Sequence, residues 1–313
     1  MNAGEHEVEL KFATNAAGLR AAFESDLLPA FVPDGRAKSL ISAYFDTSDQ
    51  VLRKRKTSLR LRRSGRSIPV MTLKRKPTKS QGPFAREEIE VRIRSQAPRI
   101  DAFDTGIARE LSDLLQGRPL ELQFETRVRR RTRQIVFGGS KIEAAFDQGH
   151  IQAGDRRTRL NEVELELKEG SPSDLYALGS VLIAALPLRL DPMSKAQAAY
   201  NLARNEHATP AGAEPIVFAA DASIDTAIAV ILQNTIEHFL SNWASLRASD
   251  DPESIHQMRV ALRRMRSAIA ILSATAPCPQ FSEIRAKAKD LADRLGLARQ
   301  CDVFKDLLDG SLL

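Results

Sequence analysis

Two stretches of the chain decide its fold: EVELK at residues 7–11 and EVELELK at residues 162–168. In both stretches charged and apolar side chains alternate strictly. This is the period of a β-strand, in which successive side chains point to opposite faces. Each stretch therefore forms a strand with one charged face and one apolar face. Helices that cover the apolar faces from outside would leave the charges in the interior of a barrel.

The same alternation recurs in short segments between these two stretches. Gly and Pro separate the segments, as turns of an antiparallel sheet require. Apolar stripes near residues 16–28, 100–115 and 173–185 predict three helices that can cover the sheet. We therefore predict an α+β fold with a charged lumen. The positions that share a charged face within one strand are Arg60 and Arg62; Lys74 and Lys76; Arg86, Glu88 and Glu90; and Glu143 and Asp147.

The composition is that of a globular protein with an anionic partner. The chain has 313 residues and a net charge of +6, from 46 Lys and Arg against 40 Asp and Glu. The low aromatic content argues against a base-stacking surface, so we expect no nucleic-acid partner. Cys278 and Cys301 show no ligand-like spacing, which favours a reducing compartment. Without a signal peptide or an apolar run long enough for a membrane span, we expect a cytoplasmic protein without membrane contact.

A change of character divides the chain into domains. Residues 1–204 contain the alternating segments and form the expected tunnel domain. Residues 205–221 are small, Pro-containing and without period, which indicates a linker. Residues 222–313 have helical periodicity throughout, and we predict helices near residues 224–247, 253–274 and 282–297.

The charge types of the tunnel suit a metal ion and a phosphate chain. Clustered carboxylates are hard oxygen ligands for Mg²⁺ or Mn²⁺. Clustered lysines and arginines suit phosphate oxygens, and arginine can bind them bidentately. A metal that bridges phosphates opposite a basic cradle is the arrangement phosphoryl transfer requires. The chain has no P-loop pattern, so a Walker-type site is excluded.

The order of the charged motifs resembles that of the CYTH superfamily, the triphosphate tunnel metalloenzymes. EVELK at residues 7–11 is similar to the ExExK signature of this family. The further motifs follow in the same order over about 190 residues: YFDT at 44–47, LRLRR at 59–63, TLK at 72–74, REEIE at 86–90, the segment 124–130, Glu143 with DQG at 147–149, EVELELK at 162–168, and SK at 194–195. The resemblance implies an eight-stranded antiparallel β tunnel with flanking helices, followed here by an all-α segment.

The resemblance also implies roles for individual residues. It implies metal binding by Glu7, Glu9 and carboxylates among Glu162, Glu164 and Glu166. The resemblance favours Glu164 and Glu166, although the alternation along the strand alone does not choose among the three. It implies triphosphate binding by Lys11, Arg60, Arg62, Lys74, Arg86, Arg130 and Lys195. Glu88 and Glu90 are candidates to hold a second metal or to orient water, and Lys11 and Lys74 join the carboxylates as catalytic candidates. Asp46 favours a structural role, because Asp is common in turns.

Residues 251–266 place two stripes on one expected helix. The apolar stripe packs inward. A cationic stripe that suits an anionic chain is formed by His256, Arg259, Arg263 and Arg266. This segment resembles the start of a CHAD domain, and LGLARQCDV at 295–303 is similar to a second CHAD motif. The resemblance implies polyphosphate binding by His256, Arg259, Arg263 and Arg299. Because the segment is about half as long as a CHAD domain, we expect either a truncated chain or self-association, such as a homodimer.

The pairing of CYTH with CHAD implies metal-dependent hydrolysis of inorganic triphosphate to diphosphate and phosphate. Other reactions of the same tunnel stay open: cyclisation of ATP by a class IV-type adenylate cyclase, or hydrolysis of thiamine or nucleoside triphosphates. A non-catalytic polyphosphate-binding protein is the alternative of a different class.

Overall fold

The computed structural model describes residues 5–28, 36–77, 82–218, 222–249 and 251–310. These residues separate into two compact units: the described residues of 5–77 and 84–206 form one, and those of 207–310, with residues 82–83, form the other. We call them the barrel unit and the helical unit. The two units are described separately below.

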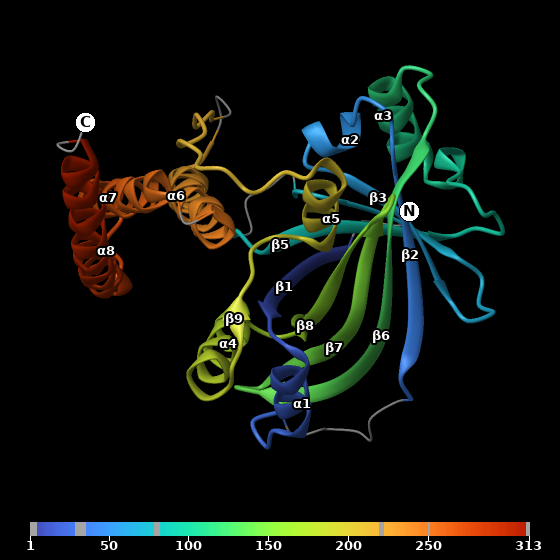
Figure 1. The fold of residues 1–313 in the computed structure, drawn as a ribbon, viewed down its shortest axis with the longest axis horizontal. Coiled ribbons are helices and arrows are strands. Elements are labelled where there is room, and N and C mark those ends of the chain that lie inside the picture. The colour runs from blue at the N-terminus through green and yellow to red at the C-terminus, as the bar shows by residue number, and fades with distance from the viewer. Residues whose placement is uncertain (1–4, 29–35, 78–81, 219–221, 250, 311–313) are drawn as a thin grey trace. The chain divides into compact units, whose positions relative to one another are not determined.

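Eight strands of the barrel unit close into one antiparallel sheet in the order β1-β5-β4-β3-β2-β6-β7-β8, and β8 pairs back with β1. Closure removes the exposed edges of the sheet. The described residues thus confirm the expected eight-stranded antiparallel barrel (Figure 1). The short β9 adds beside β1. The strands are β1 (Glu5–Ala13), β2 (Lys38–Asp46), β3 (Ser58–Ser64), β4 (Val70–Arg75), β5 (Ala85–Arg92), β6 (Glu121–Phe137), β7 (Ser140–Ala153), β8 (Arg156–Glu169) and β9 (Arg189–Leu190).

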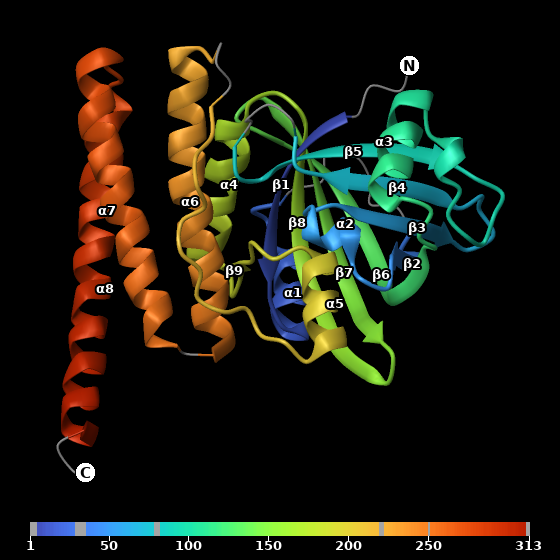
Figure 2. The same ribbon diagram turned by 90° about the horizontal axis from the view of Figure 1, so that it is seen from above.

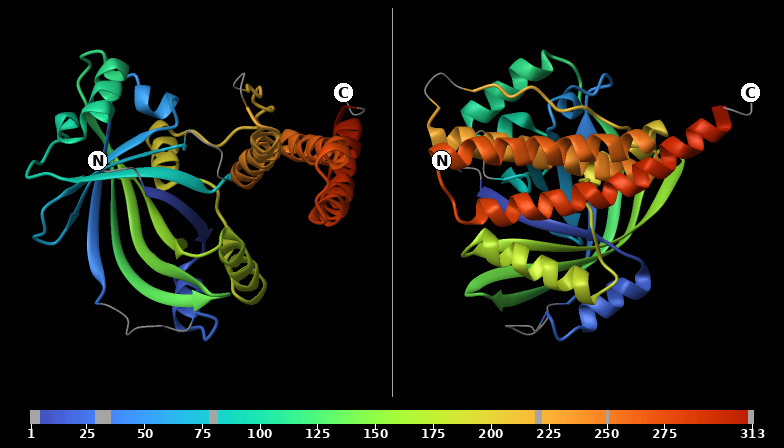
Figure 3. Two further views of the ribbon diagram at one scale, coloured as in Figure 1. Left: turned by 180° about the vertical axis from the view of Figure 1, so that it is seen from behind. Right: turned by 90° about the vertical axis from the view of Figure 1, so that its left-hand side faces the viewer.

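Helices cover the outer faces of the barrel in two places (Figures 1 and 3). Helices α1 (Ala16–Glu24) and α4 (Pro172–Ala185) pack on β1, β7 and β8 through a buried cluster that includes Phe12, Phe146 and Leu165. Helices α2 (Val51–Lys54) and α3 (Thr105–Leu115), with the 3₁₀ turn η1 (Ile100–Ala102), cover β2 to β5 through a second cluster. Helix α1 ends four residues before the expected limit. The apolar faces of the strands therefore point outward, as expected from the sequence.

A third apolar cluster lies on the inward faces of the strands, at one end of the lumen. Tyr44 and Phe124 stack on each other, and Tyr200 meets the ring of Phe124 edge-on. Tyr200 belongs to helix α5 (Lys195–Arg204), which packs on β6, β7 and β8 (Figure 2). Because Tyr44 and Phe124 share their strand faces with lumen-facing residues, α5 fills the lumen at this end.

Asp46 anchors this end of the barrel. Its fully buried carboxylate accepts hydrogen bonds from the backbone N–H groups of Leu52 and Arg53 in α2, and from the Tyr200 hydroxyl at 2.8 Å. Asp46 therefore caps α2 and ties it to α5. This confirms the structural role expected for Asp46.

The helical unit consists of α6 (Ile224–Ser249), α7 (Pro252–Thr275) and α8 (Gln280–Gly310), with α7 packed against both neighbours (Figure 2). Helix α8 begins near the expected position and extends 13 residues further than expected. Met258, Leu262 and Ile269 of α7 are buried, as the apolar stripe predicts. In contrast, the buried residues of α6 are polar, and His238 bonds to Gln257 of α7. No helix in the described part of the chain is long and apolar enough to cross a membrane.

Candidate active site

The inward faces of the strands bring the predicted charged residues together in one lumen. The strand register places acids directly beside acids and beside bases, so that pairs distant in sequence become neighbours. The cross-strand pairs are Glu7 with Arg86, Glu9 with Glu166, Lys11 with Glu164, Lys74 with Glu88, and Arg130 with Asp147.

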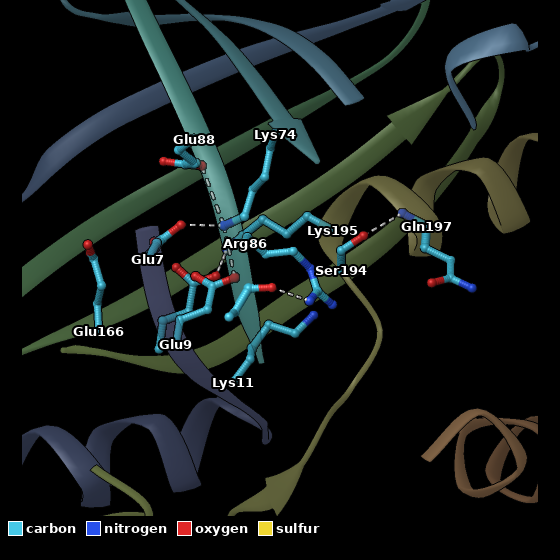
Figure 4. Close-up of polar contacts among 12 residues, drawn as sticks. Glu7, Glu9, Lys11, Lys74, Arg86, Glu88, Glu166, Ser194, Lys195 and Gln197 are labelled. Atoms are coloured by element: carbon cyan, nitrogen blue, oxygen red, sulfur yellow. Dashed lines mark hydrogen bonds and ion pairs between the residues drawn. The ribbon is translucent and has the colours of Figure 1, made fainter. Parts of the chain in front are cut away.

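Lys74 lies at the centre of the first group of charges (Figure 4). Its ammonium is 2.7 Å from a Glu7 oxygen, 3.0 Å from Glu9 and 3.4 Å from Glu88. Two strands, β1 and β5, thus supply the three carboxylates that hold one lysine of β4. Glu88 also contacts Arg60 at 3.3 Å, and Glu90 accepts a hydrogen bond from Thr72.

The carboxylates of this group are not fully neutralised by the cations beside them. Burial, reinforced by neighbouring Glu9, raises the pKa of Glu7 to about 8, against the opposing effect of Lys74. Burial favours the neutral form of Lys74, but Glu9, Glu7 and Glu88 outweigh it and raise the pKa of Lys74. Lys74 therefore stays charged, and Glu7, Glu9 and Glu88 share this ammonium and the Arg60 guanidinium. The three carboxylates thus outnumber the two cations that contact them.

Lys195 is the centre of the second group. Its ammonium lies 3.0 Å from Asp147 and 2.6 Å from Glu164, and it also pairs closely with Glu162. Arg130 binds Asp147 bidentately, with N–O distances of 2.7 and 2.6 Å, and contacts Glu164. Lys195 begins helix α5, so the helix that fills the lumen also places this ammonium.

Lys11 joins the second group from the side of β1. Its ammonium lies 3.9 Å from Glu162 and 3.6 Å from Asp191, and it donates to the carbonyl of Met193. Asp191 and Met193 belong to the segment that leads into α5. Lys11 therefore links strand β1 to the beginning of that helix.

Two arginines of β3 are only partly neutralised. Arg62 donates to the Ser42 hydroxyl at 3.3 Å and has no ion pair within the described part of the chain. Burial, with Arg60 and Arg130 nearby, lowers the pKa of Arg62 to about 10. The Nε of Arg60 is buried and has no hydrogen-bond partner among the described residues. A guanidinium with one buried N–H unpaired, beside a second guanidinium without an ion pair, makes this part of the lumen favourable for an anion.

The two remaining predicted residues also face the lumen. Arg86 donates to the carbonyl of Ala85 at 2.7 Å. Glu166 pairs with Lys168, and burial raises the pKa of Glu166. Neither residue joins the group around Lys195. Glu162 and Glu164 do join it, which distinguishes them from Glu166.

Three carboxylates are close enough to share one cation. Asp147, Glu162 and Glu164 offer oxygens that all lie within 4.8 Å of one another. A set of carboxylate oxygens is the donor set that Mg²⁺ and Mn²⁺ prefer. Here the Lys195 ammonium lies among these oxygens. A divalent cation would fit the same donors if it displaced that ammonium. The displaced ammonium would then be free to bind a phosphate oxygen.

Sequence reasoning placed Asp147 on a charged face but did not select it as a site residue. Asp147 is fully buried, and it connects Arg130 to Lys195. The available signal was its shared face with Glu143. Its importance comes from the β6–β7 register, which the sequence does not reveal.

The predicted cationic residues of the helical unit have different environments. His256 and Arg263 are exposed on α7. Arg259 instead donates to the carbonyl of Ala292 in α8 at 2.9 Å. The side chain of Arg299 lies outside the described residues.

Fold and site together define a closed β tunnel whose lumen combines clustered carboxylates with lysines and arginines. The CYTH domain family model matches residues 5–200, and the chain belongs to this family. The CHAD domain model matches residues 230–313.

One curated relative is the inorganic triphosphatase of Haemophilus influenzae, which is 30% identical over 168 residues. The match covers 54% of this chain and 47% of the relative, so the chain spans about half the length of that protein.

Two solved structures are also similar to this chain. One is a candidate adenylyl cyclase from Hippeastrum described as having a dominant triphosphatase activity, with 19% identity, a TM-score of 0.41, and coverage of 63% of this chain and 95% of that chain. The other is the inorganic triphosphatase NE1496, with 22% identity, a TM-score of 0.22, and coverage of 55% and 78%.

Proposed function

We propose that the tunnel hydrolyses inorganic triphosphate to diphosphate and phosphate, with Mg²⁺ or Mn²⁺ as cofactor. The observation that carries the proposal is the set of half-buried arginines in the lumen, in which Arg62 has no ion pair in the described part of the chain. Arg62 lies near Arg60 and Arg130, and Arg130 contacts the carboxylates around Lys195. The named activity of the Haemophilus influenzae relative supports the same reaction.

In this reaction the arginines, lysines and carboxylates of the tunnel have different roles. Arg60, Arg62 and Arg130 hold phosphate oxygens and orient the chain along the lumen. Lys11, Lys74 and Lys195 neutralise the charge that shifts to the leaving oxygen. A divalent cation, when bound by the tunnel carboxylates, adds further neutralisation of phosphate charge.

Glu88 and Glu90 are the candidates for orienting the attacking water. The water oxygen attacks a terminal phosphorus, and the bond from that phosphorus to the bridging oxygen breaks. Diphosphate leaves with the bonding electrons, and the water proton passes to a tunnel carboxylate.

The packing at one end of the lumen favours a substrate without a large organic part. Tyr44, Phe124 and Tyr200 fill that end together with α5. A nucleoside attached to the phosphates would have to lie elsewhere. This observation favours inorganic triphosphate over ATP or thiamine triphosphate.

A matched pair of variants on β5 tests the proposal. Glu88→Gln alters a carboxylate that contacts Lys74 and Arg60 in the lumen, whereas Glu87→Gln alters the next residue, which pairs with Arg75 on the outer face. We expect Glu88→Gln to lower kcat for triphosphate hydrolysis by about 100-fold or more. Glu87→Gln should stay within about threefold of wild type, because it changes only an outer ion pair. Equal rates for the two variants would contradict the proposed site.

A further inference from the structure

One part of the outer barrel wall is covered by neither of the two outer apolar clusters. On β6, β7 and β8, the outward residues near α1 and α4 are buried, but the outward residues in the other half of each strand are not part of either cluster. Figure 2 shows this half at the hairpin end of β7 and β8. We call these nine residues the outer wall: Glu125, Arg127 and Arg129; Gln148, His150 and Gln152; and Arg157, Arg159 and Asn161.

The strand register arranges the outer wall as a grid of three rows across three strands. One row is Glu125, Gln152 and Arg157; the middle row is Arg127, His150 and Arg159; the last row is Arg129, Gln148 and Asn161. Strands lie about 4.8 Å apart, and alternate residues along a strand lie about 6.7 Å apart. The grid therefore measures about 10 Å by 13 Å.

The outer wall is strongly basic and only partly neutralised. Arg127 pairs with Glu125 at 2.9 Å, and Glu125 is the single acid of the grid. Arg157 contacts the His150 ring at 3.0 Å. Arg129 and Arg159 are exposed and have no acidic partner among the described residues. Arg127 and Arg129 are neighbours on one face of β6, and Arg157 and Arg159 on one face of β8. Like charges so close along a strand repel each other, so the sheet alone does not favour this arrangement.

We propose that the outer wall binds a linear inorganic polyphosphate chain. All four cations are arginines, whose planar forks suit phosphate oxygens, and the three amide side chains add hydrogen-bond donors. The nine residues include no apolar side chain, whereas a protein partner requires an apolar centre of the interface. They also include no Phe, Tyr or Trp ring, the side chains on which nucleic-acid bases most often stack. The wall lies outside the lumen, so this binding does not depend on the proposed hydrolysis.

The test compares two full-length variants that lose the same charge. The wall variant is Arg127→Ser/Arg129→Ser/Arg157→Ser/Arg159→Ser. The control variant replaces four other exposed arginines of the barrel unit by serine: Arg66, Arg92, Arg94 and Arg109. Both variants and the parent also have His256→Ser and Arg263→Ser, so that the exposed basic residues of α7 do not contribute. Thermal unfolding followed by circular dichroism checks that each protein is folded.

Binding of a labelled long-chain inorganic polyphosphate is measured by fluorescence anisotropy in EDTA, over a series of salt concentrations. We expect the wall variant to bind at least about 10-fold more weakly than the control variant. The slope of log K against log salt should fall by about 3, from about 0.7 for each of the four lost phosphate contacts. Equal affinity and slope for the two variants would overturn the proposal. Tighter binding of single-stranded DNA than of polyphosphate by the parent would overturn it as well and identify nucleic acid as the partner.

Discussion

Replacement of Lys195 by methionine tests the electrostatic arrangement of the tunnel. The change keeps the length of the side chain and removes the charge that Asp147, Glu162 and Glu164 share. Two buried carboxylates and one half-buried carboxylate then face each other, with Arg130 as their principal remaining cation. Breaking a buried ion pair from one side typically lowers the free energy of unfolding by about 3–5 kcal/mol. For a unit of this size, the midpoint of thermal unfolding should fall by roughly 10 °C.

The same variant should bind divalent cations more strongly. In the wild type, the Lys195 ammonium lies among the oxygens that fit a cation, so a cation must displace it. Lys195→Met removes this competition. We therefore expect Mn²⁺ to raise the unfolding midpoint of Lys195→Met, relative to EDTA, by more than it raises that of the wild type. The assay is thermal unfolding by circular dichroism, with each protein in EDTA and in excess Mn²⁺.

Lys141→Met is the control for this experiment, because Lys141 pairs with Glu169 on an exposed surface. Its loss should change stability by less than about 1 kcal/mol, with the same response to Mn²⁺ as the wild type. The reasoning is refuted if Lys195→Met and Lys141→Met have equal midpoints in EDTA. It is also refuted if Mn²⁺ stabilises Lys195→Met no more than the wild type.

Two further predictions concern stability. Tyr200→Phe removes the hydroxyl that donates a hydrogen bond to buried Asp46. The free energy of unfolding, measured by urea titration followed by circular dichroism, should fall by about 1–3 kcal/mol. An unchanged value would mean that the Asp46–Tyr200 hydrogen bond does not anchor α5. In the helical unit, burial lowers the pKa of His238 below its usual value, so the unfolded state binds the proton more readily. Stability of this unit should therefore be fully present above pH of about 6.5 and decline as the pH falls through the folded-state pKa. Fluorescence of Trp243, the only tryptophan, follows unfolding of this unit, and His238→Gln should weaken the pH dependence. An identical pH dependence in wild type and variant would refute the assignment to His238.

The strands with one charged and one apolar face were predictable because their two faces meet different surroundings. In β1 and β8, apolar side chains such as Phe12 and Leu165 contact the outer helices, while Glu9 and Glu164 face the lumen. The alternation of charged and apolar residues in the sequence therefore corresponds to the alternation between lumen and outer helices. The eight-stranded closure and the individual roles came from the order of the motifs rather than from periodicity.

Strand β2 was not predicted because both of its faces are covered. Tyr44 packs inward on the α5 cluster, and Phe45 packs outward on the cluster below α3. The sequence of this strand therefore has no alternation. Helix α5 was not predicted either. The sequence indicates only its first residues, as the SK motif, although Ala199 and Tyr200 are buried in the lumen.

The alternation along each strand could not predict which charged side chains gather around Lys74 and which gather around Lys195. Parity places Glu162, Glu164 and Glu166 on one face, but the β1–β8 and β7–β8 registers decide which of them approach Lys195. The same registers place Asp147 beside Arg130. Register depends on contacts between segments distant in sequence, so it becomes visible only in the folded barrel.

The most direct test of the central claim is product analysis with three substrates. Purified protein is incubated with inorganic triphosphate, ATP or thiamine triphosphate, in Mg²⁺, Mn²⁺ or EDTA, and the products are separated by anion-exchange chromatography. We predict diphosphate and phosphate from inorganic triphosphate, dependence on the added metal, and much slower turnover of ATP and thiamine triphosphate. Cyclic AMP from ATP, or no product from inorganic triphosphate with either metal, would contradict the account.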